Sequence, residues 1–283
     1  MPPIVAVIAP GMMGSAVAAR LTASGVQVRT SLTGRSAATI ARAKAAGMTD
    51  ATDAQLAEAD FILSIVPPGQ ALALAERLAP AIRGQDRKPI YVDCNAVSPD
   101  TVLRIDSVVR EAGATFVDGG IIGPPPELDS SKTRIYLSGP DAETVTVLQQ
   151  YGLSTPVQPG PVGAASAMKM SYAGITKGFT ALGAAMMLAA TRAGTADALV
   201  AEMTVSQPVL LKWLTTQMPK MHGKAYRWVA EMEEIAAFVG KDHPGSGFYE
   251  AAARLYEKIA ADFDGPRTET SALDAFCEKA KAR

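Results

Sequence analysis

Short apolar runs alternate with longer amphipathic segments over the first half of the chain. The apolar runs are rich in β-branched residues and are PIVAVI, VQVRTS, FILSIV, IYVDC and TFVDG. Between them, Ala-rich segments with helical periodicity cover residues 12–24, 36–47, 68–81 and 98–112. Strands that are apolar on both faces, joined by crossovers of about a dozen residues, are typical of a parallel sheet with helices on both sides. The pattern therefore predicts a doubly wound α/β domain.

The pattern changes at TPVQPGPVG, a segment rich in Pro and Gly at residues 155–163. Beyond it the strand signals nearly vanish, and residues 164–193 form one long helical pattern rich in Ala and Met. The glycines within this helix would weaken it unless another element packs closely against them. We expect an α/β domain at residues 1–163 and an all-helical domain at residues 164–283.

Composition excludes several classes of protein. Apolar residues make up 48% of the chain and charged residues 19%, which is typical of a globular protein rather than a disordered one. Lys and Arg total 27 against 28 for Asp and Glu, so no positive field favours nucleic acid or an anionic membrane. The two cysteines and two histidines predict neither a disulfide framework nor a metal site. Since the chain has no basic leader and no uninterrupted apolar stretch of about 20 residues, we expect a cytoplasmic protein that does not enter a membrane.

The segment VIAPGMMG, at residues 7–14, lies where the first predicted strand ends and the first helix begins. It resembles the G-x-G-x-x-G loop of dinucleotide-binding domains, in which backbone N–H groups and a helix N-terminus hold a pyrophosphate. Ala9 replaces the first glycine, and Pro10 stiffens the turn. A plain strand-to-helix turn is the alternative, because this motif alone is weak evidence. If the sheet is of the Rossmann type, the loop residues that contact the cofactor are Ala9, Gly11, Met12, Met13 and Gly14.

The second predicted strand indicates which dinucleotide is bound. NAD sites usually place an acid about 20 residues after the glycines, where it accepts hydrogen bonds from the ribose hydroxyls. Here no Asp or Glu precedes Asp50, and the segment after the strand is SLTGRS. Hydroxyls from Ser31 and Thr33 and the guanidinium of Arg35 would instead hold a 2′-phosphate. The sequence therefore favours NADP(H), although solvated loop residues are the alternative for each side chain.

Together these features resemble the β-hydroxyacid dehydrogenases, the relatives of 6-phosphogluconate and 3-hydroxyisobutyrate dehydrogenases. Besides the glycine loop, the matching segments are SIVPP at 64–68 for the family's post-strand LP, VDCNAVSP at 92–99 for D-x-S-T-x-x-P, FVDGGIIGPPP at 116–126 for F-V-D-A-P-V-S-G-G, and GAASAMKMSYAG at 163–174 for G-x-G-x-x-x-K-x-x-N-N. They follow the family's order over nearly the whole chain. The resemblance implies a Rossmann-type domain in which Val66 and Pro67 lie along the cofactor, followed by a helical domain through which the proteins form dimers.

The resemblance assigns the central chemical role to Lys169. The family uses the lysine of this motif as its general acid/base, and a partly desolvated lysine can have its pKa lowered toward neutrality. A charge on this apolar helix has no evident structural purpose, although a lysine that extends to solvent from a helix face is the alternative. Lys177 lies two turns further on and has no motif behind it.

Several departures from the family pattern leave the substrate open. The paired asparagines after the lysine are Tyr172 and Ala173 here, and Tyr172 could donate its phenolic proton instead. The serine that binds the substrate carboxylate in the family is Ile122, so we expect Ile121, Ile122 and Gly123 to line the substrate site. Asn95 replaces the serine of the substrate loop and is the best remaining anchor for the substrate or for the nicotinamide carboxamide, with a turn residue at a strand end as the alternative. The turn glycines Gly119, Gly120 and Gly123 would let the backbone approach a ligand.

In the C-terminal part, RWVAEMEEIAAFVGKDHP aligns with a helix that the family places near the cofactor. Arg227 stands where the family has a lysine, and Trp228 replaces its acidic partner, which makes the first a candidate cofactor contact and the second a candidate substrate contact. The alternative is that Trp228, Met232 and Ile235 form a helical stripe that serves a core or a dimer contact.

Three functions remain open from the sequence. The first is an NADP-dependent dehydrogenase or reductase acting on a hydroxy/oxo acid or a related alcohol, with Lys169, Tyr172 and Asn95 at its catalytic centre. The second is an imine reductase on the same architecture, and the third is a catalytically silent NADP-binding scaffold. Retention of Lys169 favours the first. The apolar surface of the long helix at 164–193 predicts a homodimer.

Overall fold

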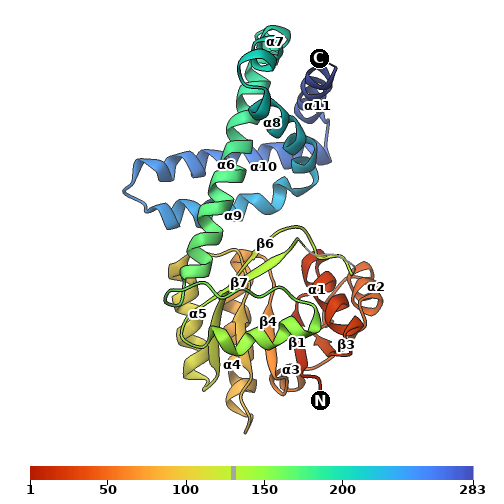
Figure 1. Cartoon of the computed structure of the whole chain (residues 1–283), viewed down its shortest axis with the longest axis vertical. Helices are drawn as coiled ribbons and strands as arrows, with labels where there is room; N and C mark the ends of the chain where they lie inside the picture. Colours follow the sequence, from red (N-terminus) through yellow and green to blue (C-terminus); the bar gives the residue numbers. More distant parts are fainter. Residues whose placement is uncertain (129–131, 283) are drawn as a thin grey trace. The chain divides into compact units, whose positions relative to one another are not determined.

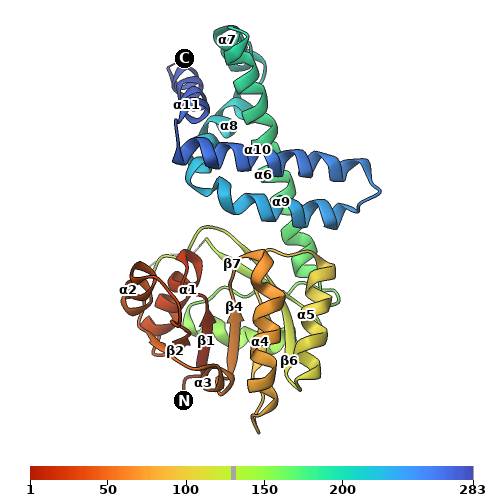
Figure 2. The same ribbon diagram turned by 180° about the vertical axis from the view of Figure 1, so that it is seen from behind.

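The computed structural model describes residues 1–128 and 132–282, which divide into two compact units, Met1–Met170 and Ser171–Arg283. The boundary between the units falls inside the long helix rather than at its start, where the sequence pattern changes. Figures 1 and 2 show the two units from opposite sides.

The first unit is built around one seven-stranded sheet with the order β3-β2-β1-β4-β5-β6-β7. Its strands are β1 (Ile4–Ile8), β2 (Gln27–Thr30), β3 (Met48–Asp50), β4 (Phe61–Ser64), β5 (Ile90–Asp93), β6 (Thr115–Ile122) and β7 (Arg134–Ser138). All neighbouring strands are parallel except β7, which runs antiparallel to β6. The order in which the chain adds strands reverses between β1 and β4: strands are added on one side of β1 up to β3 and on its other side from β4 onward. Doubly wound folds bind their ligands at this position. The predicted α/β Rossmann-type fold is confirmed.

Helices cover both faces of this sheet. They are α1 (Met12–Ala23), α2 (Ala37–Ala45), α3 (Asp53–Ala57), α4 (Ala71–Arg83) and α5 (Pro99–Glu111), with the 3₁₀ helices η1 (Pro68–Gln70) and η2 (Ala142–Tyr151). Buried side chains of α1, α2 and η2 form one core with the sheet, and those of α3, α4 and α5 form the other. Figure 2 shows α4 and α5 side by side over their face.

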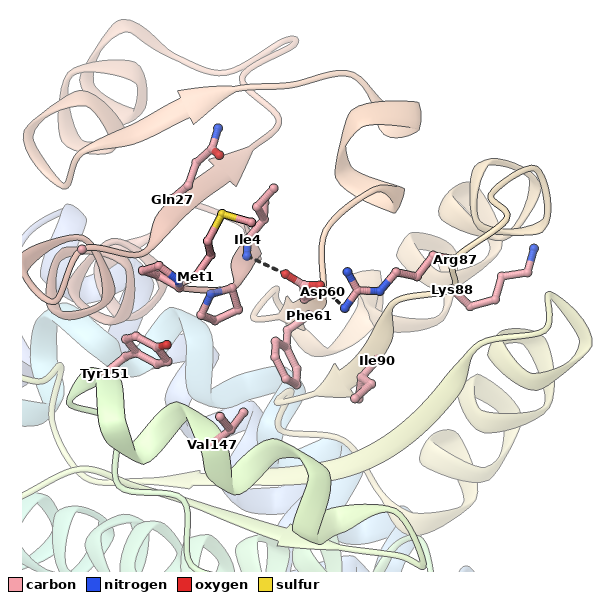
Figure 3. Close-up of a pocket in the computed structure, with 13 residues that line it drawn as sticks. Met1, Ile4, Gln27, Asp60, Phe61, Arg87, Lys88, Ile90, Val147 and Tyr151 are labelled. Carbon is pink, nitrogen blue, oxygen red and sulfur yellow. Dashed lines mark hydrogen bonds and ion pairs between the residues drawn. The ribbon is translucent and has the colours of Figure 1, made fainter.

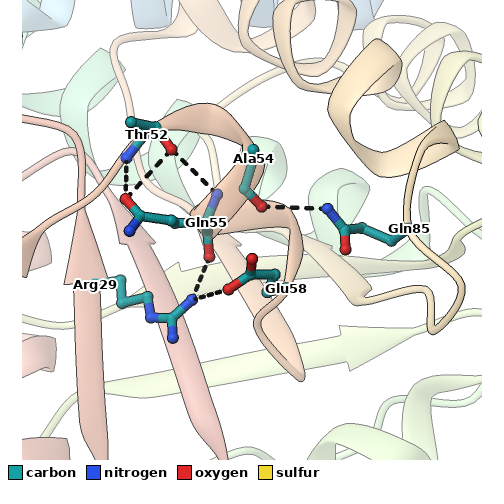
Figure 4. Close-up of polar contacts among 6 residues, drawn as sticks. All are labelled: Arg29, Thr52, Ala54, Gln55, Glu58 and Gln85. Carbon is teal, nitrogen blue, oxygen red and sulfur yellow. Dashed lines mark hydrogen bonds and ion pairs between the residues drawn. The ribbon is translucent and has the colours of Figure 1, made fainter.

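The helix α3 illustrates how local chemistry fixes a short element that the sequence pattern does not predict. The Thr52 hydroxyl accepts a hydrogen bond from the Gln55 backbone N–H, and the Gln55 side chain accepts one from the Thr52 N–H (Figure 4). This reciprocal capping satisfies amides that a helix of five residues would otherwise leave unpaired. Arg29 of β2 donates to the Gln55 carbonyl at 2.5 Å and pairs with Glu58 at 3.0 Å, which ties α3 to the sheet.

The second unit is helical, as expected. Its elements are the rest of α6 (Ala164–Arg192), then α7 (Ala196–Ser206), α8 (Pro208–Met221), the 3₁₀ helix η3 (His222–Lys224), α9 (Ala225–Val239), α10 (Pro244–Asp264) and α11 (Thr268–Lys281). The helix α9 packs along α10, and α11 packs against α7 and α8.

The glycines of α6 make the close contacts that their positions predict. A Cβ atom on Gly174 would lie 3.0 Å from the Tyr249 hydroxyl, and one on Gly183 would lie 2.5 Å from Leu214 Cδ2. These approaches compensate for the low helix propensity of glycine. By length and composition α6 could cross a membrane, a test that the core helix of a soluble protein also passes; 44% of its most apolar window is buried.

Candidate functional site

The glycine loop joins the carboxyl end of β1 to the first turn of α1. A Cβ atom on Gly14 would lie 2.1 Å from the Ala9 carbonyl oxygen, so only glycine lets the helix pack this closely on the strand. A Cβ atom on Gly11 would meet no atom within 4 Å, and Gly11 is exposed at the N-cap of α1. The loop therefore has an open backbone surface at a helix N-terminus, which fits the pyrophosphate of a dinucleotide.

The segment after β2 lies at the same edge of the sheet. Ser31 is buried, Thr33 is exposed and Arg35 is half-buried. The Leu32 N–H donates to the Asp50 carboxylate at 2.8 Å. Asp50 ends β3, a strand that the sequence pattern does not predict, and its carboxylate holds the backbone of this segment.

The basic residues of the first 50 positions have separate roles. The Arg20 guanidinium donates to the Gly152 carbonyl at 2.7 Å, and Arg29 is engaged with α3 as described above, so both serve the fold. Arg42 of α2 donates to the Pro10 carbonyl at 3.2 Å, which places a cation beside the glycine loop. Arg35 and Arg42 are therefore the cations best placed to meet a phosphorylated ribose, and the role of Arg42 was not apparent from sequence spacing.

Asn95 is buried and engaged with the protein. Its amide N–H groups donate to Ser64 Oγ at 2.7 Å and to the Asp93 carboxylate, and its carbonyl oxygen accepts from the Val66 N–H at 2.7 Å. These bonds fix the segment after β4 that was expected to lie along the cofactor. The side chain expected to contact the substrate thus braces Val66 instead, because both of its N–H donors are used within the protein.

Gly119 of β6 and Gly123, which follows it, approach other protein atoms closely. A Cβ atom on Gly119 would lie 2.9 Å from the Asp93 carbonyl oxygen, and one on Gly123, whose φ is +128°, would lie 2.7 Å from Thr133 Cα. Ile121 is 7% exposed and belongs to the core on the α1 side of the sheet. Burial of Ile121 in this core argues against a substrate contact by its side chain, whereas Ile122 is half-buried and stays a candidate, and the role of the glycine backbone stays a prediction.

Gly120 places Lys169 against the sheet. A Cβ atom on Gly120 would lie 2.8 Å from the Ala165 carbonyl oxygen and 3.2 Å from Lys169 Cβ. The absence of a side chain thus lets the second turn of α6 rest on β6 near its carboxyl end. Lys169 is half-buried at this position.

Two buried carboxylates lie beneath this edge. Asp93 and Asp118 are paired in register on β5 and β6, and neither is exposed. Burial, with the charge of Asp118 as a second cause, raises the pKa of Asp93 to about 8. Sequence analysis assigned a role to neither carboxylate. Within residues 1–128 and 132–282, no group of three His, Cys, Asp or Glu side chains could hold a metal ion.

The remaining candidates belong to the second unit. Tyr172 is 51% exposed on α6, and the Arg227 guanidinium lies 5.7 Å from the Tyr226 ring centroid. Trp228 makes an edge-to-face contact with Tyr256 at 5.2 Å between centroids. Met232 and Ile235 are buried on the same helix, so this stripe does pack inside the helical unit. The proposed ligand contacts of these candidates remain predictions.

A separate cavity of about 830 Å³ lies at the opposite edge of the sheet (Figure 3). Ile4, Phe61 and Ile90 line it, and they begin β1, β4 and β5. Asp60 accepts a hydrogen bond from the Ile4 N–H at 2.8 Å and pairs with Arg87 at 2.5 Å. Since doubly wound folds bind ligands at the carboxyl ends of their strands, this cavity is not the nucleotide site.

The chain matches known families in both of its parts. Residues 4–152 match the NAD binding domain of 6-phosphogluconate dehydrogenase, and residues 190–259 match a domain of unknown function, DUF1932. The first match covers more than half of the chain and contains the glycine loop, Arg35, Val66 and Asn95. The chain therefore belongs to the β-hydroxyacid dehydrogenase-like family and carries its NAD(P)-binding fold.

Two relatives are more than 30% identical to this chain. An uncharacterized 28.5 kDa protein of Methanothermus fervidus is 32% identical over 177 residues, which are 62% of this chain and 66% of that protein. The conserved protein MTH1747, of unknown function and described as structurally similar to 3-hydroxyacid dehydrogenases, is 31% identical, with a TM-score of 0.69 over 94% of this chain and 98% of its own.

More distant structures share the fold alone. The 3-hydroxyisobutyrate dehydrogenase of Mycobacterium tuberculosis, described with L-serine, has a TM-score of 0.69 at 17% identity and covers 100% of this chain and 99% of its own. An imine reductase of Streptomyces aurantiacus has a TM-score of 0.54 at 20% identity over 95% and 97% of the two chains. The fold therefore hosts both C=O and C=N chemistry.

Proposed function

We propose that this protein is an NADP(H)-dependent oxidoreductase that transfers a hydride between the nicotinamide and a hydroxy/oxo acid or a related alcohol or carbonyl compound. The observation that carries the proposal is the placement of Lys169 on the second turn of α6, packed against Gly120 of β6. A lysine whose stem is held at this position could transfer a proton to and from a reacting oxygen. Membership of the dehydrogenase-like family supports the same conclusion.

Different residues would bind the parts of the cofactor and transfer the proton. The open backbone at Gly11 and the N-terminus of α1 would bind the pyrophosphate. Thr33, Arg35 and Arg42 would bind the 2′-phosphate, while Asn95 holds Val66 and Pro67 in line for the nicotinamide half. When bound, the nicotinamide supplies the hydride transfer itself. Lys169 then donates a proton to the oxygen in the reducing direction and removes it in the oxidising direction.

Residues of the second unit would contribute further contacts with the substrate and the cofactor. Tyr172 follows Lys169 by three residues on the same helix face, so it would orient the substrate or share the proton transfer. Arg227 and Trp228 are proposed contacts for the cofactor and the substrate, respectively. The protein would act in the cytoplasm as a homodimer.

Cofactor preference is the first test. We expect NADPH to bind at least tenfold more tightly than NADH, roughly 1.4 kcal/mol at 25 °C, because the segment after β2 contains Arg35 and no acid. Isothermal titration of both cofactors measures the ratio. Arg35→Ala should reduce it, whereas Lys44→Ala, which removes an exposed cation near the end of α2, should leave it unchanged. Equal affinities for the two cofactors in the unmodified protein would contradict the assignment.

Turnover is the second test. The purified protein is incubated with NADPH and a panel of oxo acids, aldehydes, ketones and cyclic imines, and the decrease in absorbance at the reduced nicotinamide band is followed. We expect NADPH to be oxidised fastest when the substrate is a carbonyl compound, since Lys169 can protonate the alkoxide that hydride transfer produces. Fastest turnover of an imine would favour the imine reductase instead, and tight NADPH binding without any turnover would indicate a scaffold.

A further inference from the structure

Asp118 lies beneath the start of α6 and accepts hydrogen bonds from its first turn. Its Oδ2 atom accepts from the Gly163 N–H at 3.0 Å and from the Ser166 N–H at 3.1 Å. Its Oδ1 atom accepts from the Ser166 hydroxyl at 2.6 Å. Asp118 is fully buried, so these bonds are shielded from competition by water.

Ser138 of β7 completes the arrangement. Its hydroxyl donates to Asp118 Oδ2 at 2.8 Å and accepts from the Ala165 N–H at 2.9 Å. The amides at the start of a helix have no partner within the helix, and a carboxylate near that end is stabilised by the helix dipole. Asp118 and Ser138 together therefore satisfy the amides of Gly163, Ala165 and Ser166 from two neighbouring strands.

The same turn carries Lys169. Lys169 follows Ala165 by one helical turn, and both contact the space above Gly120, two residues after Asp118 on β6. The strand thus fixes α6 twice, by hydrogen bonds at its first turn and by close backbone packing at its second. A shift of the first turn would move Lys169 with it, because α6 is a continuous helix from Ala164 onward.

We propose that Asp118 is a positioning residue for Lys169: its buried carboxylate holds the first turn of α6 on the sheet and thereby sets the place from which the lysine transfers its proton. This inference rests on the proposed function of Lys169. A displacement of about 1 Å in a catalytic group can reduce a rate about 100-fold, which is the effect that this arrangement prevents. Asp118 itself does not contact the reacting atoms.

The test compares two substitutions at this position. In Asp118→Asn the amide oxygen can accept the bonds now made to Oδ2, and the amide N–H can donate to the Ser166 hydroxyl, which also accepts. In Asp118→Ala all of these bonds are lost. Asp100→Ala, which removes an exposed carboxylate from the first turn of α5, is the matched control.

Hydrogen exchange gives the readout that does not require activity. We expect Asp118→Ala to raise the exchange rate of residues 163–170 at least tenfold, with β1 and β4 unchanged, and Asp118→Asn to remain within about threefold of the unmodified protein. If Asp118→Ala does not fold, Ser166→Ala, which removes one of the bonds, should raise exchange in the same segment by a smaller factor. Unchanged protection of this segment in folded Asp118→Ala, or in Ser166→Ala where Asp118→Ala does not fold, would overturn the inference.

Kinetics separates positioning from simple stabilisation. On the carbonyl compound reduced fastest in the panel, Asp118→Ala should lower kcat 10- to 100-fold with little change in NADPH affinity, and Asp118→Asn should restore most of the rate. Full kcat in folded Asp118→Ala, or an equal loss in both variants, would contradict the inference. If the unmodified protein turns over no substrate, the proposed function fails while the exchange experiment still decides the role of Asp118.

Discussion

Asp93 and Asp118 are paired in register on neighbouring strands, and their buried carboxyls differ in their hydrogen-bond partners. Burial raises the pKa of Asp118, while the bonds that it accepts from two backbone amides and two hydroxyls act in the opposite direction. Asp93 accepts from Asn95, but its Oδ2 atom is buried without a hydrogen-bond partner among the described residues. Burial and the neighbouring charge raise the pKa of Asp93 to about 8, so Asp93 carries the proton at neutral pH.

This raised pKa predicts a specific dependence of stability on pH. In the unfolded chain Asp93 ionises near its usual pKa of about 3.9, whereas in the folded protein it stays protonated up to about pH 8. The unfolded state is therefore favoured increasingly as the pH rises from about 4 to 8, and the loss levels off above 8. Asp93→Asn cannot ionise, so its melting temperature relative to the unmodified protein should rise between pH 5 and pH 9. The same difference in melting temperature between Asp93→Asn and the unmodified protein at pH 5, 7 and 9 would contradict this interpretation.

At the scale of single residues, sequence analysis could state what a motif residue does within its own loop, but not which distant residues a side chain contacts. Gly11 and Gly14 could be assigned because the spacing of the motif states what each glycine must do. Asn95 and Gly119 were expected to face a ligand, yet each contacts a neighbouring strand or loop. Most of their partners lie more than 20 residues away in the chain, and no local pattern specifies which of two nearby groups a side chain will meet.

At the scale of elements, the helical unit contains an ion pair that the sequence did not indicate. Lys177 of α6 pairs with Glu231 of α9, and the two side chains are only 16% and 14% exposed. The Lys177 ammonium also lies 5.2 Å from the Trp228 ring centroid, and the Tyr256 hydroxyl donates to the Lys177 carbonyl. These contacts join α6, α9 and α10, so Lys177 has a structural role.

Removing one partner of this pair should destabilise the helical unit. Glu231→Gln leaves the Lys177 cation in a mostly buried place without its counter-charge, and we expect a loss of about 1–3 kcal/mol, below the range for fully buried pairs because some solvent reaches both groups. Glu233→Gln, on the exposed face of the same helix, should change stability by less than about 0.5 kcal/mol. Urea unfolding of both variants measures the difference, and equal midpoints would show that the pair contributes nothing.

The elements themselves could be predicted in proportion to the strength of their pattern. The long helix was expected at 164–193 and spans Ala164–Arg192, because a Pro- and Gly-rich segment precedes it and its composition is uniform. The strands β3 and β7 and the helix α3 were not predicted. The strand β3 and the helix α3 are only three and five residues long, too short for periodicity to distinguish them from loops, whereas β7 was missed although its five residues equal the length of the predicted β1.

At the scale of the whole molecule, α6 presents an apolar stripe. Its members are Tyr172, Ile175, Phe179, Leu182 and Met186, which are between 38% and 72% exposed. They follow one another at alternating intervals of three and four residues, the spacing by which two helices pack along a common seam. We propose that a second copy of this chain covers the stripe, as expected from the sequence.

Charges placed on this stripe should separate the copies. We expect light scattering at micromolar concentration to give a dimer for the unmodified protein and a monomer for the double variant Ile175→Glu, Leu182→Glu. Val209→Glu adds a charge at an 82% exposed apolar position on α8, outside the stripe, and should leave the dimer intact. A monomeric unmodified protein, or a double variant that remains dimeric, would refute the proposed interface.

The central claim of the account is that Lys169 transfers the proton that accompanies hydride transfer, and the most direct measurement is the kcat of Lys169→Met. On the carbonyl compound that is reduced fastest with NADPH, we expect kcat to fall about 10²- to 10⁴-fold, the usual contribution of a positioned acid or base. NADPH affinity should change little, and the pH profile of kcat/KM should lose the limb that reports the ionisation of the lysine. Tyr172→Phe should have a smaller effect if the phenol only orients the substrate. A Lys169→Met protein that retains full turnover would contradict the account.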